Sequence, residues 1–104
     1  MTFKVSFRPA AEADLRELYD YIADESGAPI AGHYIDRIQA MCLSLETSPH
    51  RGTRRDDLRP GIRTMGFERR ATIVFRVLKY EVVIVRIFYG GRDIETLMHH
   101  EPNA

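Results

Sequence analysis

The chain has 104 residues, of which 44% are hydrophobic and 29% charged, and its formal net charge is zero. These values are those of one ordinary soluble globular domain, here 1–104, with room for one core and not for two. No apolar run reaches the roughly 20 residues of a membrane span, and the first residues lack the basic and apolar regions of a signal peptide. The single cysteine, Cys42, allows no internal disulfide, so we expect a cytoplasmic protein.

The charges divide the chain into an acidic half and a basic half. Residues 1–48 hold four basic and eight acidic side chains, and residues 49–104 hold eleven basic and seven acidic ones. Thirteen of the fifteen bases are arginine, which binds carboxylate and phosphate groups through paired hydrogen bonds. The basic half is therefore either a surface that docks a macromolecule or a solvated face, and composition does not distinguish the two.

The first half of the chain predicts a strand followed by two helices. Phe3, Val5 and Phe7 alternate with polar residues, as in a strand with one buried face. Pro9 suits the first turn of a helix that ends at Ser26-Gly27, and Pro29 begins a second helix that ends before Pro49. Each helix carries one apolar stripe at helical spacing: Ala11, Leu15, Leu18, Tyr19 and Ile22 in the first, and Ala31, Tyr34, Ile35, Ile38, Met41, Cys42 and Leu45 in the second.

The second half predicts a sheet. After a turn-rich loop over 50–61, which Leu58 anchors, strands are predicted from Ile62, over 71–78 and over 81–89. Because a mid-strand arginine is rarely buried without a partner, the face that carries arginine should be open or covered by another chain. Alternation places Ile73, Phe75, Val77, Val83, Val85 and Ile87 on the face toward the core, and Thr72, Val74, Arg76, Ile84, Arg86 and Phe88 on the opposite face.

The order β-α-α-β-β-β predicts an α+β fold, with a helical hairpin packed on one face of a mainly antiparallel four-stranded sheet. Leu18, Ile38 and Phe75 are expected between the hairpin and the sheet. Cys42 lies in the middle of the second stripe, so we interpret it as a core residue and not as a reactive thiol.

Patterns for catalysis or metal binding do not occur in the sequence. The four histidines (His33, His50, His99 and His100) have no second ligand at metal-binding spacing, and there is no nucleophile motif or phosphate-binding loop. We therefore expect no metal and no cofactor. What remains is a set of arginines near the arginine-bearing face, which suits RNA phosphates and an acidic protein surface equally well: Arg63, Arg69, Arg70, Arg76, Arg86 and Arg92.

Six segments together resemble the RelE/ParE superfamily of bacterial type II toxins: 7–15, 19–22, 48–52, 58–63, 73–77 and 83–93. The first of these reads Phe-Arg-Pro-Ala-Ala-Glu-Ala-Asp-Leu, with Arg8 where the family usually has a capping serine. The segments span nearly the whole chain in the family's order. The superfamily's β-α-α-β-β-β fold agrees with the elements predicted above.

The resemblance implies one of two activities, because one branch cleaves mRNA in the ribosomal A site and the ParE branch poisons DNA gyrase. Ribonuclease members tend to carry bases or a tyrosine at five positions, which correspond here to Arg63, Met65, Thr72, Arg92 and Met98, and only the two arginines fit. No general acid or base is evident either. A gyrase-directed toxin without catalysis of its own is therefore expected. A ribosome-dependent endoribonuclease and an inactive member that only binds its antitoxin are the alternatives.

The resemblance also implies partners: a ParD-type antitoxin in a hetero-oligomer, and DNA gyrase as target, with no membrane and no sequence-specific DNA contact by this chain. We expect acidic residues of the antitoxin to form ion pairs with Arg63, Arg76 and Arg86. The candidate target-binding residues are Arg63, Arg69, Arg70 and Arg92. The candidate antitoxin-binding residues are Arg63, Arg76, Arg86, Phe88, Leu15 and Tyr19. No residue is assigned to catalysis or to a metal.

Overall fold

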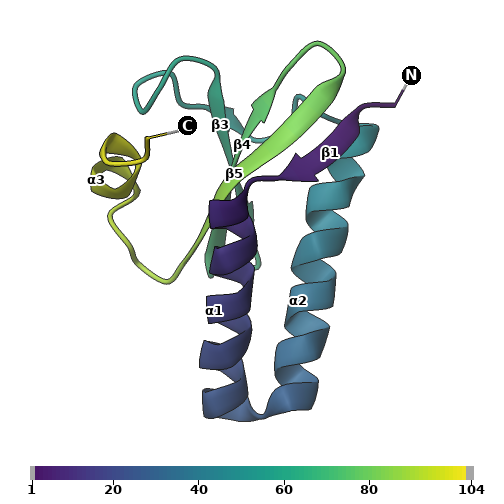
Figure 1. Ribbon diagram of the computed structural model, residues 1–104, viewed down its shortest axis with the longest axis vertical. Coiled ribbons are helices and arrows are strands. Elements are labelled where there is room, and N and C mark those ends of the chain that lie inside the picture. The colour runs from purple at the N-terminus through teal and green to yellow at the C-terminus, as the bar shows by residue number, and fades with distance from the viewer. Residues whose placement is uncertain (1, 103–104) are drawn as a thin grey trace.

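Residues 2–102 are described by the computed structural model, in which two long helices stand against one face of a twisted sheet (Figure 1). The elements in chain order are β1 (Lys4–Phe7), α1 (Pro9–Ser26), α2 (Ala28–Leu43), a 3₁₀ turn (Ser44–Glu46), β2 (Thr53–Arg54), β3 (Ile62–Phe67), β4 (Ala71–Val77), β5 (Glu81–Tyr89) and α3 (Ile94–His99). The predicted α+β class and helical hairpin are confirmed.

The sheet has five strands in the order β1-β5-β4-β3-β2, and not the four that were predicted. The additional strand, β2, lies inside the segment predicted as a loop, where Thr53 and Arg54 pair with Thr64 and Arg63 of β3. All neighbouring strands are antiparallel except β1 and β5, which run parallel. The prediction of a mainly antiparallel sheet is therefore confirmed.

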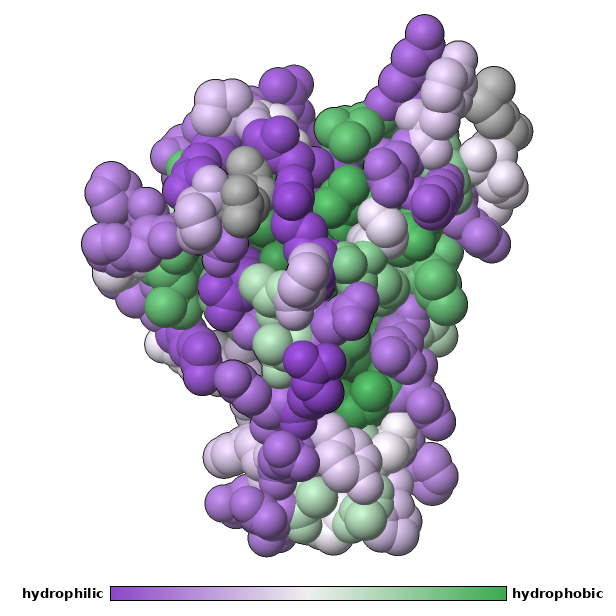
Figure 2. Space-filling view, viewed as in Figure 1, coloured by the Kyte–Doolittle hydropathy of each residue, from purple (hydrophilic) through white to green (hydrophobic). Residues whose placement is uncertain are grey.

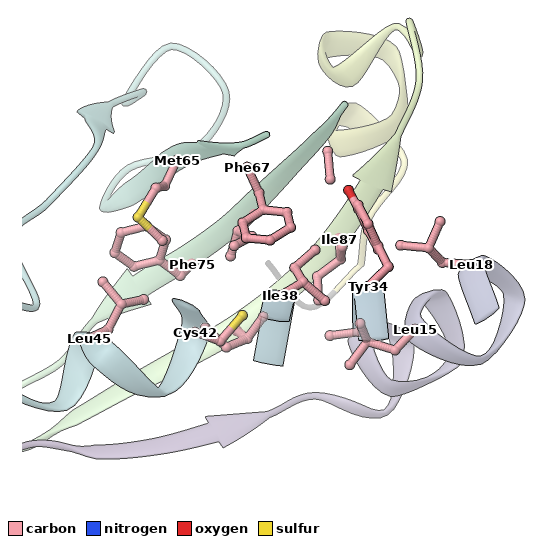
Figure 3. Close-up of a cluster of buried hydrophobic side chains, with 14 of the residues drawn as sticks. Leu15, Leu18, Tyr34, Ile38, Cys42, Leu45, Met65, Phe67, Phe75 and Ile87 are labelled. Carbon is pink, nitrogen blue, oxygen red and sulfur yellow. The ribbon is translucent and has the colours of Figure 1, made fainter. Parts of the chain in front are cut away.

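A core of apolar side chains fills the space between the hairpin and the sheet, as Figure 3 shows. Leu18, Ile38 and Phe75 all belong to it, as predicted. Cys42 is fully buried there, and burial raises the pKa of its thiol to about 12. A thiol that stays protonated at neutral pH is a poor nucleophile, so Cys42 acts as a packing residue.

The predicted orientation of β5 is wrong at three residues because of a β-bulge. Val74 of β4 pairs with Arg86 while Phe75 pairs with Ile84, so Val85 is an extra residue on β5. An extra residue reverses the alternation on one side of the bulge. As a result Ile84 faces the helices, whereas Val83 and Val85 face away from them. Ile73, Phe75, Val77 and Ile87 lie on the helix side as predicted.

The prediction that the arginine-bearing face is open or covered by another chain is also wrong, because the chain covers this face itself. A second apolar cluster lies there: Ile62, Val74, Val83, Val85, Phe88 and Met98, with Leu58, Ile94 and Leu97 against it. Met98 belongs to α3, a helix that the sequence reading missed, and it is fully buried. Asp93 caps α3 by accepting a hydrogen bond from the Thr96 amide at 3.2 Å. Leu58 anchors the 50–61 loop, as expected.

Candidate functional site

The arginines fall into two groups according to the partners that the chain gives them. Within residues 2–102, Arg8, Arg16, Arg69, Arg70 and Arg92 donate no side-chain hydrogen bond to another residue. The remaining eight are engaged inside the chain: Arg37, Arg51, Arg54, Arg55, Arg59, Arg63, Arg76 and Arg86. An arginine with an internal partner is less available to another molecule, so the first group is where a binding surface should be sought.

Two of the predicted contact residues brace the 50–61 loop. Arg63 donates from Nε and Nη2 to the carbonyl oxygens of Arg51 and His50, at 3.1 and 2.9 Å. Arg76 donates to the carbonyl oxygen of Pro60 at 2.6 Å. Both side chains keep partial exposure, and their role in antitoxin binding remains a prediction. Their local role is to hold the loop against the sheet.

Arg86, another predicted antitoxin contact, lies in an internal ion-pair network. Its guanidinium donates to both carboxylate oxygens of Asp14, at 2.7 and 2.8 Å, and to Glu101 at 2.9 Å. The hydrogen bonds that Arg86 donates to Asp14 are the main reason why the pKa of Arg86 is raised. The guanidinium also stacks on Phe88, which is 2% exposed. The structure therefore engages Arg86 with Asp14 and Glu101, its side chain being 21% exposed, and buries Phe88; their role in antitoxin binding remains a prediction.

Arg69 and Arg70 lie at a strained turn between β3 and β4. Glu68 and Arg69 have positive φ angles of 49° and 59°, and the Arg70 amide closes the turn on the Phe67 carbonyl at 3.1 Å. A turn whose two central residues have positive φ favours asparagine and glycine, because a side chain at positive φ is strained. Arg37 of α2 holds the turn by donating to both carboxylate oxygens of Glu68, at 2.8 and 3.1 Å.

The end of β5 lies next to this turn, so the turn and the β5–α3 connection form one end of the sheet. The Gly90 amide donates to the Arg70 carbonyl at 2.8 Å, and Arg92 follows two residues later. We call this region the arginine end of the sheet, defined by Arg69, Arg70 and Arg92. It unites three of the four predicted target-binding residues, while Arg63 lies toward the loop and β2.

Three tyrosines lie beside the arginine end. Tyr89 of β5 contacts Tyr21 of α1 and Tyr34 of α2, with ring centroids 5.7 and 6.0 Å apart. A cleft of about 270 Å³ between α1 and β5 includes Tyr21 and Arg92. A second cleft of about 320 Å³, between the hairpin tip and the strained turn, includes all three tyrosines and Arg70. We call the second one the tyrosine cleft.

Leu15 and Tyr19, the predicted antitoxin contacts on α1, line one groove between the two helices of the hairpin. The groove measures about 440 Å³ and runs between Phe7, α1 and Ile35 of α2. Tyr19 is 37% exposed and forms part of its wall. Figure 2 shows apolar side chains between the two helices of the hairpin, bordered by hydrophilic ones. We call it the hairpin groove.

Residues 2–102 contain no cluster of three or more histidine, cysteine or acidic side chains that could hold a metal ion. In the same range no helix has the length and apolar character needed to cross a membrane.

Comparison with known proteins identifies the family. The model of the "ParE toxin of type II toxin-antitoxin system, parDE" matches residues 5–94. The chain belongs to the ParE toxin family of type II toxin–antitoxin systems. Toxin ParE3 of Caulobacter vibrioides is 31% identical over 87 residues, which cover 84% of this chain and 85% of that protein. Toxin ParE1 of Mycobacterium tuberculosis is 27% identical over 96 residues, which cover 91% of this chain and 97% of that protein.

Solved structures agree with this assignment. A chain described as the chromosomal ParDE TA system from P. aeruginosa superposes with a TM-score of 0.75 at 28% identity, covering 86% of this toxin and 97% of that chain. The toxin–antitoxin complex RelBE2 from Mycobacterium tuberculosis gives a TM-score of 0.64 at 18% identity, covering 88% of this toxin and 95% of that chain. The second likeness shows the fold alone.

The sequence reading of this ParE-family toxin missed several residues of the site. Tyr34 was assigned only to the apolar stripe of α2, and Tyr21, Tyr89, Arg37 and Glu68 were not singled out. The turn could have been predicted, because Glu68-Arg69-Arg70 separates two runs of β-branched and aromatic residues. The pairing of Arg37 with Glu68 across 31 residues had no local signal.

Proposed function

We propose that this ParE-family toxin inhibits DNA gyrase by binding to it, without catalysis of its own, in the cytoplasm. We further propose that a ParD-type antitoxin neutralises it. The family assignment supports this choice of target and partner. The features that support binding at particular surfaces come from the structure.

The observation that carries the proposal is the strained turn at the arginine end. Two non-glycine residues at positive φ cost on the order of 1–2 kcal/mol each. Strain of this kind is often kept where it serves a function. Here it exposes Arg69 and places Arg70 beside the tyrosine cleft, and Arg92 lies on the neighbouring connection. A cation-rich surface of this kind suits an acidic patch on a protein target.

The ribonuclease alternative is disfavoured by the positions where that branch carries bases or a tyrosine. Met65 is 8% exposed and packs in the helix-side core, and Met98 is fully buried in the second cluster. Arg63 is engaged by the His50 and Arg51 carbonyls. Of the five positions, Arg92 alone combines a cation with high exposure and no salt bridge within 2–102. One such arginine is a poor basis for stabilising a phosphorane and transferring two protons.

The antitoxin is proposed to dock on the hairpin groove with an apolar helix or strand segment. Leu15, Tyr19 and Ile35 supply an apolar surface between two helices, which is the usual setting for an amphipathic segment. Because the groove and the arginine end are different surfaces, substitutions can separate antitoxin binding from target binding.

Expression in bacteria tests this function. We expect growth arrest with induction of the DNA damage response, and recovery when the cognate antitoxin is co-expressed. Growth arrest with intact DNA and specific cuts in ribosome-bound mRNA would overturn the gyrase proposal and favour the ribonuclease. No growth defect, together with tight antitoxin binding, would identify an inactive member of the family.

A further inference from the structure

The tyrosine cleft contains a buried hydroxyl group that has no partner. Tyr34 is 6% exposed, and its hydroxyl oxygen makes no hydrogen bond to any residue within 2–102. The oxygen points away from α2 in Figure 3, and Tyr34 forms part of the cleft wall. Buried polar groups are almost always hydrogen-bonded, because an unmade bond destabilises the fold. A buried hydroxyl without a partner, on a residue that lines a cleft, therefore points to a partner from outside the chain.

The charges beside this hydroxyl show what kind of partner it suits. Arg37, whose guanidinium lies 5.4 Å from the centre of the Tyr34 ring, is neutralised by its paired hydrogen bonds to Glu68. Arg70 lowers the pKa of Tyr34 while having no salt bridge of its own within the described residues. Burial, followed by Tyr89 and Glu68, dominates and raises that pKa to about 12. At neutral pH the Tyr34 hydroxyl is thus a protonated O–H donor beside the cleft, and Arg70 is a lining guanidinium without a salt bridge in the described residues.

We propose that the tyrosine cleft binds a carboxylate, which accepts hydrogen bonds from the Tyr34 hydroxyl and the Arg70 guanidinium. The carboxylate belongs to an aspartate or glutamate side chain of the toxin's target, so this step rests on the proposed gyrase function. Arg70, which has no salt bridge in the described residues, can pair with one negative charge. Glu25 and Glu68 also line the cleft and would repel a doubly charged phosphate more strongly than a singly charged carboxylate.

The walls and the volume of the cleft fit one acidic side chain. Ile22 and Ile30 supply apolar surface for its methylene groups, and the rings of Tyr21 and Tyr89 also line the cleft. The volume of about 320 Å³ is at the small end of ligand sites, as suits a single inserted side chain.

Tyr34→Phe tests the proposal, because it removes only the oxygen. Since that oxygen has no partner in the free toxin, the melting temperature of the variant should be unchanged or higher. A packing role alone therefore predicts full activity. We expect instead that the concentration for half-inhibition of gyrase supercoiling rises by about tenfold, while antitoxin affinity is unchanged. Tyr80→Phe, at an exposed tyrosine in the β4–β5 connection, is the matched control and should behave like the parent.

Arg70→Gln should cause a similar loss, and the double variant should be no weaker than the weaker single one, because both groups hold the same carboxylate. If Tyr34→Phe inhibits gyrase as well as an active parent does, the proposal is wrong. A parallel loss of antitoxin affinity would also overturn it, by assigning the cleft to the antitoxin.

Acetate titration followed by the NMR signals of ¹³C-labelled tyrosine provides a test that does not need gyrase. Saturable shifts are expected for Tyr34 with acetate, and none with methylammonium chloride at equal ionic strength. If the parent fails to inhibit gyrase, the proposed function is wrong, and this titration alone decides whether the cleft binds carboxylate. Absence of an acetate-dependent shift at Tyr34 would contradict the inference.

Discussion

Arg86 and Asp14, which lie 72 residues apart in the sequence, are joined by two hydrogen bonds of 2.7 and 2.8 Å. Asp14 also accepts a hydrogen bond from the Ile87 amide at 2.8 Å, and Glu101 binds the same guanidinium at 2.9 Å. Helix α1, strand β5 and the C-terminal segment are thus tied together at one side chain. Arg86, which the sequence analysis predicted as an antitoxin contact, therefore stabilises the fold.

Arg86→Met should therefore destabilise the toxin strongly. The Asp14 and Glu101 side chains are each 8% exposed and would be left as buried charges without a cation. Breaking such a pair typically costs about 3–5 kcal/mol. Urea denaturation measures the change, and Arg92→Met, at an exposed arginine, should shift stability by no more than about 0.5 kcal/mol. Equal midpoints for the two variants would show that the network contributes little.

Two substitutions at Arg69 separate backbone strain from side-chain function. Arg69→Gly should raise the stability by about 1 kcal/mol, because glycine adopts a φ of 59° without strain. Arg69→Ala keeps the strain and should leave stability near that of the parent. Both variants lose the cation and should inhibit gyrase less. If the glycine variant keeps full inhibition, Arg69 does not contact the target.

Tyr19→Ala should weaken antitoxin binding while gyrase inhibition is retained, because Tyr19 lies in the hairpin groove and the arginine end is a separate surface. A central aromatic contact is often worth about 2 kcal/mol or more, which corresponds to roughly a thirtyfold rise in the dissociation constant. Calorimetry with the purified antitoxin measures it, with Tyr80→Ala as the control. Unchanged affinity would place the antitoxin elsewhere.

Alkaline pH should destabilise the fold through Cys42 and Tyr34. Burial raises both folded-state pKa values to about 12. The unfolded values are near 8.5 and 10, so above them the unfolded chain loses protons that the folded chain retains. Stability should therefore fall as pH rises from about 9 to about 12. Denaturation midpoints between pH 7 and 11 test this. In Tyr34→Phe the decrease in stability above pH 10 should be smaller than in the parent. A pH-independent midpoint would contradict the burial of both groups.

The sequence was sufficient where local signals agree with tertiary structure. Pro9 begins α1, Gly27 with φ of 94° separates the two helices, and the stripe containing Ile38 packs on the sheet. The orientation of β5 could not be derived, because alternation assumes a regular strand and the bulge at Val85 depends on pairing with β4. Helix α3 is too short to show periodicity, and its burial depends on Met98 reaching the second cluster.

The candidate site, too, could be predicted only as far as local sequence signals reach. Composition predicted that arginines form a binding surface, and the structure places Arg69, Arg70 and Arg92 at the same end of the sheet. Which arginines have internal partners depends on groups distant in sequence, such as Asp14 for Arg86, so it required the structure.

Inhibition of gyrase supercoiling by the purified toxin, assayed beside ribosome-dependent mRNA cleavage, tests the central claim most directly. We predict that the parent blocks supercoiling and cuts no mRNA, and that Arg63→Ala and Arg92→Ala each keep part of the inhibition, since most single truncations in a broad contact surface cost less than about 1 kcal/mol. Specific mRNA cuts that either substitution abolishes, with supercoiling unaffected by the parent, would contradict the account and make these arginines catalytic.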